Sequence, residues 1–520
     1  MKKEVVVAAA VTTAAAVVGA ALLARHLKRR SERRLRQAQR ILRKFATDCA
    51  TPVAKLWHIA NELTSEMQRA LAVDSTDGDS RPPLPMFVSY LAPLPSGEEK
   101  GTYYGIYLRG TNFVMLRAKL DGKNEPVSEL QRQEVQIPSS VMADTNSSKE
   151  LLDFISLELA KFVSIHAKEG EAGSREHKLG FTVSFPADQV AAFTSTINFE
   201  SKDLSFDATV GRELRDQFHK SLETNGLNMQ VFALVDDTIG NLAGGRYYSK
   251  ESVAAVTLGM ATDVSYIESP QQASKLLAQQ PNSSEMVRKF GTDINQIIFR
   301  LSKLHSWQVV NMQWGNYTSS HLPLTEFDVS LDVESTNPGH RIFEKLISGM
   351  YLGEIVRRVL LKMARETALF GDCVPPKLAI PYLLKSPDMA AMHQDTSEDY
   401  EVVTEKLKEV FEINDSSPMA REIVAEVCDI VVERGARLVG AGIVGIVKKQ
   451  GRLANKRSVI TMEGGLYEHY RIFRNYLHSS VWEMLGSELS DNVIIEHSHG
   501  GSGAGSIFLA AAQTQYNAKH

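Results

Sequence analysis

Two adjacent aspartates, Asp236 and Asp237, are residues whose type and spacing could do chemistry. They lie in the segment LVDDTIG. Because like charges resist joint ionisation, we expect the pKa of at least one of the two carboxyl groups to be raised. Carboxyl groups with a raised pKa are common in acid–base catalysis. The same context would also suit an aspartate that only caps a turn, so the pair needs support from the rest of the chain.

Glycine-rich segments and two histidines are weaker signals. The segment GGSGAG at 500–505 would let backbone amides approach a phosphate, but on its own it is a weak motif. The segment GAGIVGIVKK at 440–449 is, on its own, typical of a core helix that contains glycine. His497 and His499 have no metal-ligand partners at a recognised spacing, so we expect no metal site of the chain's own.

Composition places the chain among ordinary globular proteins. Its 520 residues are 43% hydrophobic and 23% charged, with a net charge of −4, which excludes wholesale disorder and multi-pass membrane classes. A net negative charge is not typical of proteins that bind nucleic acid broadly, so we expect no nucleic-acid partner. The three cysteines are too few and too scattered for a disulfide framework, which favours a reducing compartment.

The N-terminal stretch differs from the remainder of the chain. Residues 5–24 carry no charge and are just long enough to cross a bilayer as a helix. A strongly basic segment, RHLKRRSERRLR, follows, and the positive-inside rule then places the body of the chain in the cytosol. A cleaved signal peptide ending near Ala21 or Ala24 is the alternative. The basic cluster and the low cysteine content favour the anchor.

The hydrophobic pattern predicts an α/β architecture. Residues 35–72 have helical periodicity that Pro52 interrupts, so two helices are expected, and the linker at 74–85 follows them. Strand-like runs and helical periods then alternate along the chain. The runs expected to form strands are 101–120, 177–186 and 229–245, and the expected helices are 149–167, 209–225, 347–366 and 421–451.

Five ordered segments carry a resemblance to a known family. They are IYLRGTNF, LGFTVSFP, LVDDTIGNLAGGRYY, LGMATDVSYIE and TEFDVSLDVESTNPGHRIFEKLISGMYLGEIVRRVL, and GLYEHYRIFR and EHSHGGSGAG extend the match toward the C-terminus. Together they resemble the hexokinase family, and specifically plant hexokinases with an N-terminal membrane anchor. The resemblance implies a two-lobed actin/hexokinase/Hsp70-like (ribonuclease H-like) fold.

The resemblance also implies domain boundaries. The expected parts are an anchor with its basic flank at 1–34, N-terminal helices and a linker at 35–85, a small lobe at 86–235 to which 490–520 returns, and a large lobe at 236–489.

On the sugar side the resemblance makes Asp237 the catalytic aspartate. Ser184, Lys202 and Glu344 match the family's hexose contacts, and Ser201 replaces a threonine. Three further positions depart from the family pattern in the same pocket. Asp236 and Asp263 stand where the family has asparagine, and Gln313 stands where it has glutamate. We therefore expect a hexose pocket that is altered but retained.

The phosphate side departs further from the family. In IYLRGTNFV, Tyr107 replaces an aspartate that helps to hold magnesium, Arg109 replaces a glycine and Val114 replaces an arginine. A side chain at Arg109 obstructs the approach of phosphate to the backbone. Gly500 replaces another acid, and Glu463 replaces an aspartate. The remaining candidate nucleotide-binding residues are Gly110, Thr111, Asn112, Gly501, Ser502 and Gly503.

These departures favour a hexose-binding protein with weak or no kinase activity that acts in glucose sensing or regulation. The alternative is a working ATP-dependent hexokinase that forms glucose or fructose 6-phosphate, and a membrane-tethered scaffold that binds no sugar is a third, weaker reading. ATP with Mg²⁺ is the implied cofactor, and its binding is expected to be weak. Expected partners are hexose, a membrane and protein partners such as actin or regulatory complexes. The resemblance favours the mitochondrial outer membrane, with the plastid outer envelope as the alternative.

Overall fold

The computed structural model describes most of the chain. The described residues are 25, 29–30, 32–71, 84–90, 94–122, 126–143, 148–167, 177–184, 217–269, 271–272 and 308–519. The expected anchor at 5–24 and the candidate residues Ser201 and Lys202 lie outside them. Within the described ranges, no helix has both the length and the apolar character needed to cross a membrane.

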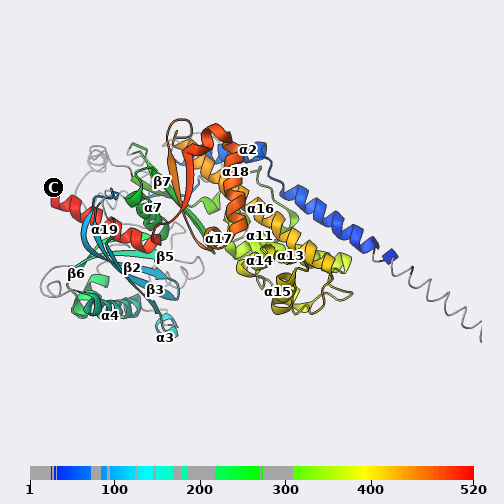
Figure 1. Ribbon diagram of the computed structural model, residues 1–520, viewed down its shortest axis with the longest axis horizontal. Helices are drawn as coiled ribbons and strands as arrows, with labels where there is room; N and C mark the ends of the chain where they lie inside the picture. Colours follow the sequence, from blue (N-terminus) through cyan, green and yellow to red (C-terminus); the bar gives the residue numbers. More distant parts are fainter. Residues whose placement is uncertain are drawn as a thin grey trace, which may run out of the picture. The chain divides into compact units, whose positions relative to one another are not determined.

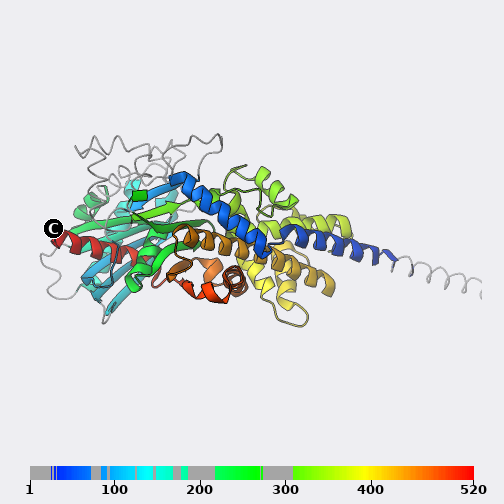
Figure 2. The same cartoon turned by 90° about the horizontal axis from the view of Figure 1, so that it is seen from above.

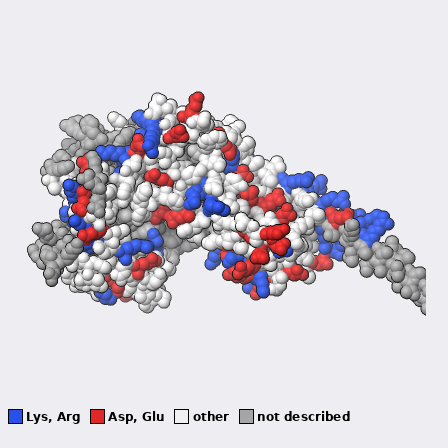
Figure 3. Space-filling model, in the orientation of Figure 1, with Lys and Arg blue, Asp and Glu red and all other residues white. Residues whose placement is uncertain are grey.

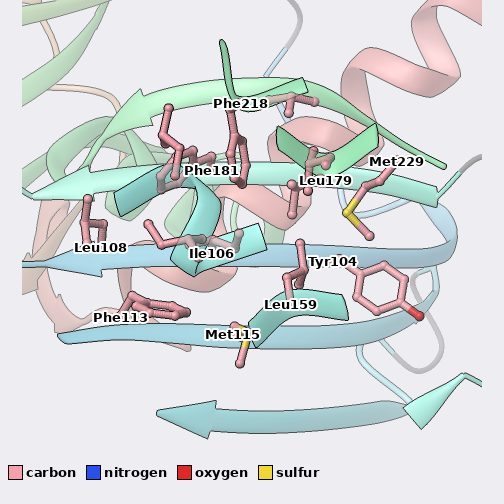
Figure 4. Packing of buried hydrophobic residues seen from close by; sticks show 14 of the residues in the cluster. Tyr104, Ile106, Leu108, Phe113, Met115, Leu159, Leu179, Phe181, Phe218 and Met229 are labelled. Atoms are coloured by element: carbon pink, nitrogen blue, oxygen red, sulfur yellow. The ribbon is translucent and has the colours of Figure 1, made fainter. Parts of the chain in front are cut away.

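One sheet has five strands in the order β4-β3-β2-β5-β6. Neighbours are antiparallel from β4 to β2 and parallel from β2 to β6. The strand bounds are β2 (Lys100–Arg109), β3 (Asn112–Asp121), β4 (Glu129–Gln136), β5 (His177–Ser184) and β6 (Met229–Asp236). Because side chains alternate across a strand, Tyr104, Ile106 and Leu108 of β2 share one face. They join a buried cluster with Leu159 of α4 (Ser148–His166), as Figure 4 shows.

The opposite face of this sheet is covered by α19 (Gly501–Lys519), the C-terminal helix in Figures 1 and 2. Glycines allow the close approach. A Cβ atom at Gly180 of β5 would lie 2.1 Å from the carbonyl oxygen of Ser506. A Cβ atom at Gly505 would lie 1.7 Å from the carbonyl oxygen of Gly240 in α7 (Asp237–Tyr248). The glycine-rich segment at 500–505, which suggested a phosphate loop, therefore also allows α19 to pack closely against α7.

The other sheet has six strands in the order β1-β9-β8-β7-β10-β11. It is antiparallel from β1 to β7 and parallel from β7 to β11, so both sheets follow the same sequence of orientations. The strand bounds are β1 (Met86–Tyr90), β7 (Ser252–Leu258), β8 (Thr262–Glu268), β9 (Gln308–Met312), β10 (Ser458–Glu463) and β11 (Val493–His497). Two such sheets joined by helices form the mixed α/β architecture that the pattern predicted.

Helix α16 (Pro418–Lys449) packs closely through its glycines. A Cβ atom at Gly442 would lie 2.6 Å from the ring of Trp314, and one at Gly445 would lie 2.9 Å from the carbonyl oxygen of Ala60 in α2 (Val53–Leu71). These contacts support the reading of 440–449 as a core helix. Further elements of the chain are α3 (Ser139–Ala143), α12 (Ile342–Ile347), α13 (Gly349–Thr367), α17 (Gly465–Glu468), α18 (Arg471–Leu489), η1 (Trp314–Asn316) and η3 (Ser490–Asn492).

The chain divides into two compact units. Both sheets belong to the unit made of residues 52–322, 339–350 and 435–520. The other unit is helical in its described part, and in it Phe45 packs edge-on against Phe327 and Arg434 forms a buried ion pair with Asp328 at 2.7 Å. Its further elements are α11 (Glu326–Glu334), η2 (Pro376–Ala379), α14 (Ser386–His393) and α15 (Glu401–Phe411).

Most of the expected elements are confirmed, and one is wrong in part. Helices at 32–49 and Val53–Leu71 flank Pro52 as predicted, and α13 and α16 match the two long expected helices. The run at 229–245 is not one strand. Its strand ends at Asp236, whose side chain caps α7, so the helix begins at Asp237.

Charges of both signs are interspersed over the face in Figure 3. Basic side chains gather along the N-terminal helix, where the exposed arginines include Arg33, Arg36, Arg40 and Arg43.

Candidate functional site

The candidate residues meet at one edge of the five-stranded sheet. In the parallel part of the sheet, Arg109 pairs with Ser184 and Val183 pairs with Asp236, so β2, β5 and β6 end at the same edge. Helix α7 begins directly after Asp236. The carboxyl ends of parallel strands are where α/β folds commonly bind ligands. This edge therefore holds one catalytic and several binding candidates from the sequence.

Asp236 is tied into the backbone at the start of α7. Its Oδ1 accepts the backbone N–H of Ile239 at 2.8 Å and the hydroxyl of Thr238 at 2.8 Å. A carboxylate at a helix N-terminus is also favoured by the helix dipole. The capping function that the sequence left open is thus real for Asp236, and it leaves Oδ2 of the same carboxyl facing other groups.

Asp263 reaches the same place from the six-stranded sheet. Asn311 of β9 donates from Nδ2 to Asp236 Oδ2 at 3.2 Å and to Asp263 Oδ2 at 3.1 Å. The hydroxyls of Thr238 and Ser265 lie 2.7 Å apart in the same cluster. Two sheets are therefore joined at this edge by one amide and a pair of hydroxyls.

Burial raises the pKa of both substituted aspartates. For Asp236 the loss of water is partly offset by its hydrogen bonds to Ile239, Thr238 and Asn311, and its pKa is raised. For Asp263 burial is again the largest cause, the nearby charges of Asp236 and Asp237 add to it, and the pKa rises well above the ordinary aspartate value. The direction of the shift is the one expected, but burial is its largest cause, and the charges of neighbouring acids contribute only for Asp263.

Glu344 and Gln313 lie beside this cluster. Glu344 Oε2 accepts the backbone N–H of Thr262 at 3.3 Å and forms an ion pair with Arg341 at 2.5 Å. Thr262 precedes Asp263, so Glu344 is one residue removed from the carboxyl pair. Gln313 directly follows β9 and accepts a hydrogen bond from Asn316 at 3.4 Å. Both candidates therefore belong to the same site.

Asp237 is the first residue of α7 and is half-buried. The charge of Asp237 raises the pKa of Asp263, so Asp237 lies close enough to act on this cluster. An ionised carboxylate in this position could accept a proton from a ligand hydroxyl. Ser184 ends β5 at the same edge. Asp236, Asp237 and Asp263 are thus brought together, and Glu344 contacts Thr262 beside them. Gln313 follows the strand that carries Asn311, and Ser184 lies at the adjoining strand end.

The end of β2 carries different chemistry. Tyr107 is buried on the α19 face, where a Cβ atom at Gly503 would lie 3.1 Å from its Cβ. The guanidinium carbon of Arg109 lies 4.4 Å from the centroid of the Tyr107 ring, a cation–π contact. Tyr107 thus fills the position where the family pattern has an acid, and it orients a positive side chain above itself.

The neighbouring turn keeps its polar residues but uses one of them internally. Gly110 has a φ of 46°, which favours glycine, and Thr111 is exposed. Asn112 Nδ2 donates to Glu134 Oε1 at 2.5 Å across the β3–β4 pair. Gly110 thus keeps the positive φ that favours glycine, whereas the Asn112 side chain is held by Glu134.

The second group of nucleotide-binding candidates lies at the start of α19. Glu463 is buried, and its Oε1 would lie 3.3 Å from a Cβ atom at Gly501. Ser502 and Gly503 follow in the first turn of the helix. Gly500 has a φ of 82°, and a Cβ atom there would lie 2.8 Å from the Cβ of Ala504. An aspartate at Gly500 would therefore require both a strained backbone and a shift of Ala504.

These residues do not fit a nucleotide-bound magnesium ion well. Magnesium requires hard oxygen ligands, and the two residues at the end of β2 supply an aromatic ring and a guanidinium instead. In the described ranges, no group of three or more His, Cys, Asp or Glu side chains could hold a metal ion. The two residues at the end of β2 therefore supply no ligand for such an ion.

Asn311 and Met260 were not among the residues predicted from the sequence. Asn311 lies two positions before Gln313, and the alternation of β9 could have placed it on the same face. Met260 lies in the loop between β7 and β8, where GMATD replaces the family's GTGTN, and its side chain is 60% exposed. A thioether cannot donate a hydrogen bond as threonine does. The polar character of this loop is therefore reduced as well.

Comparisons with known proteins identify the family. Two family models, both described as hexokinase, match residues 41–247 and 253–512. The chain is 45% identical over 483 residues to Hexokinase-1 of Spinacia oleracea, covering 92% of this chain and 91% of that protein. It is 47% identical over 485 residues to Hexokinase-2 of Arabidopsis thaliana, with 92% and 90% covered.

Solved structures give the same result for the fold. A hexokinase from Schistosoma mansoni, complexed with glucose, superposes with a TM-score of 0.69 at 25% identity, covering 91% of this chain and 99% of that one. A second hexokinase crystal structure gives 0.70 at 23% identity, covering 92% and 99%. The two-lobed fold expected from the sequence is thereby confirmed. Members of this family use ATP and Mg²⁺. The chain belongs to the hexokinase family and is similar to its plant members.

Proposed function

We propose that this protein binds hexose, glucose in the first place, and transfers phosphate weakly or not at all, so that it acts in glucose sensing or regulation. The observation that carries this proposal is the end of β2, where Tyr107 is buried and Arg109 stacks on its ring. Phosphoryl transfer depends on positioning and on charge stabilisation, and these residues provide neither a metal ligand nor close backbone approach.

The sugar side supports binding. Asp236, Asp263 and Asn311 form a connected polar cluster, and Glu344 joins it through Thr262. Buried polar groups of this kind require partners, since each unmatched group costs about 1–3 kcal/mol. The hydroxyl groups of a hexose are suitable partners, and the structural relative from Schistosoma mansoni holds glucose.

An active ATP-dependent hexokinase is the alternative. Two observations favour it: identity of 45–47% to plant hexokinases over nine tenths of the chain, and the retention of Asp237 at the start of α7. Glucose binding measured by calorimetry and glucose 6-phosphate formation, on the same purified full-length protein, would separate the two. Binding with no turnover supports the proposal. Turnover on the order of 1–10³ per second would establish the alternative, and absence of both would leave only a scaffold function.

We further propose that residues 1–24 anchor the protein to a membrane, with the mitochondrial outer membrane favoured over the plastid outer envelope and the body of the chain in the cytosol. The uncharged run at 5–24 and the basic segment after it support this proposal. Deleting residues 1–24 should release the protein into the soluble fraction. Pelleting of the truncated protein through a carbonate wash would contradict the proposal, whereas association removed by salt would reflect the exposed arginines alone.

A further inference from the structure

Asn311 joins two carboxyl groups that come from different sheets. Its Nδ2 carries two hydrogens, and it lies 3.2 Å from Asp236 Oδ2 and 3.1 Å from Asp263 Oδ2. Asn311 is only 8% exposed, so water does not replace it easily as a donor. One neutral amide thus holds the two acids close together, and it contributes no positive charge.

The elements around this pair bring a further acid and no unpaired cation among their described residues. Helix α7 adds Asp237, and the Thr238 and Ser265 hydroxyls are neutral. On α12, Lys345 donates to the carbonyl of His340. At the start of that helix Arg341 pairs with Glu344. The near ends of β7, β8 and β9 carry no basic residue. The donor that links Asp236 and Asp263 is therefore neutral, and Asp237 is a further acid whose charge acts on Asp263.

Asp236 and Asp263 differ in the number of hydrogen bonds that stabilise their ionised forms. Asp236 receives the Ile239 N–H, the Thr238 O–H and the Asn311 N–H, and these donors stabilise its ionised form. Asp263 receives the Asn311 N–H and the N–H of the adjacent Val264, at 2.9 Å. The charges of Asp236 and Asp237 also act against ionisation of Asp263. A proton taken up by this cluster therefore resides on Asp263.

We propose that Asp263 binds hexose as a neutral carboxylic acid, held in place by Asn311, and that hexose binding is coupled to the uptake of one proton. A protonated carboxyl has one O–H donor and one carbonyl acceptor, which is the combination that an asparagine amide offers. An ionised carboxylate only accepts, and cannot donate to a sugar oxygen. This inference rests on the proposed hexose binding and assigns the donor within that site. Asn311 is a positioning residue in this scheme.

The test is isothermal calorimetry of glucose binding by the full-length protein between pH 5.5 and 8.5, in buffers of different ionisation enthalpy. Affinity should fall by up to about 10-fold per pH unit above the pKa of Asp263, with uptake approaching one proton per hexose. Asp263→Asn should abolish the pH dependence and the proton uptake while it retains tight binding at pH 8.5. Asp491→Asn, an exposed acid on η3 in the same unit, is the matched control and should behave as the unmodified protein.

Asn311→Ala removes the shared donor, so it should move the midpoint of the pH profile upward, an effect that mere loosening of the fold would not produce. Circular dichroism at each pH checks that the variants are folded. Binding without proton uptake, or a pH dependence that survives in Asp263→Asn, overturns the inference and leaves the proposed function intact. Absence of binding in all variants at every pH overturns both.

Discussion

The two groups of candidate residues, those for hexose (the sugar side) and those for nucleotide (the phosphate side), depart from the family pattern in different ways. On the sugar side, Asp236 and Asp263 replace amides but remain hydrogen-bonded through Asn311, so the site keeps its polar connections. On the phosphate side, Tyr107 packs on α19 and Arg109 packs on Tyr107, so an aromatic ring stands where the family pattern has an acid. The difference teaches that an acid in place of an amide can keep its hydrogen bonds, whereas a packed ring in place of an acid cannot supply a carboxylate's oxygens.

The largest expected effect follows from restoring the phosphate side. The variant Tyr107→Asp, Arg109→Gly should raise glucose 6-phosphate formation on the order of 10²-fold over the unmodified protein, because charge stabilisation usually dominates such catalysis. A coupled assay of product formation measures this effect. Adding Asp237→Ala should abolish the gain, because it removes the proposed proton acceptor.

Two further variants sharpen that test. Adding Gly500→Asp restores another acid, but the φ of 82° and the contact with Ala504 predict a less stable protein. The sugar-side triple Asp236→Asn, Asp263→Asn, Gln313→Glu should improve affinity more than turnover, and the combined variant is needed if the two sides act as a unit. Ordinary turnover by the unmodified protein would show that the two sides do not differ as described.

Nucleotide binding should respond next. The variant Tyr107→Asp, Arg109→Gly should bind ATP-Mg at least ~10-fold more tightly than the unmodified protein, which corresponds to ~1.4 kcal/mol for one charge-assisted contact. Calorimetric titration with ATP-Mg measures the difference. Equal affinities would show that the end of β2 does not limit nucleotide binding.

Stability should reveal the altered sugar side. A raised pKa for Asp263 means that the folded protein binds this proton more tightly than the unfolded chain. Its contribution to stability is therefore present at low pH and is lost as the pH rises through the raised value. Asp263→Asn should accordingly raise the free energy of unfolding on the order of 1 kcal/mol at pH 8. Near pH 4 denaturant titration should find no gain, and a gain of equal size at both pH values would contradict the assignment.

The smallest effect is expected at Glu463. Glu463→Asp keeps the charge beside Gly501 and shortens the side chain by one methylene, so the affinity for ATP-Mg should change by less than about 3-fold, or about 0.6 kcal/mol. The same titration measures it. A change as large as that of the Tyr107 and Arg109 variant would move the main defect from β2 to the start of α19.

The sequence by itself determined the family, the α/β class and most helices, because ordered motifs and hydrophobic periodicity are local properties that the fold retains. It also determined which residues depart from the family pattern and the sign of the pKa shift that clustered acids produce. It failed at 229–245, where apolar residues continue on both sides of the two aspartates, so the pattern does not reveal the change from strand to helix at Asp236. The lobe boundaries, the membrane and the roles of the individual site residues stay predictions.

Only the tertiary structure decided which side chains meet. Asn311 lies 75 residues from Asp236 and 48 from Asp263 in the sequence, and periodicity gives the face of a strand without naming its partner. Packing likewise decided the surroundings of Tyr107, which lies against Gly503 near the other end of the chain. The sequence determines the chemical group that each residue carries. The pKa of that group depends on distances to other charges and on burial, and these exist only in the folded chain.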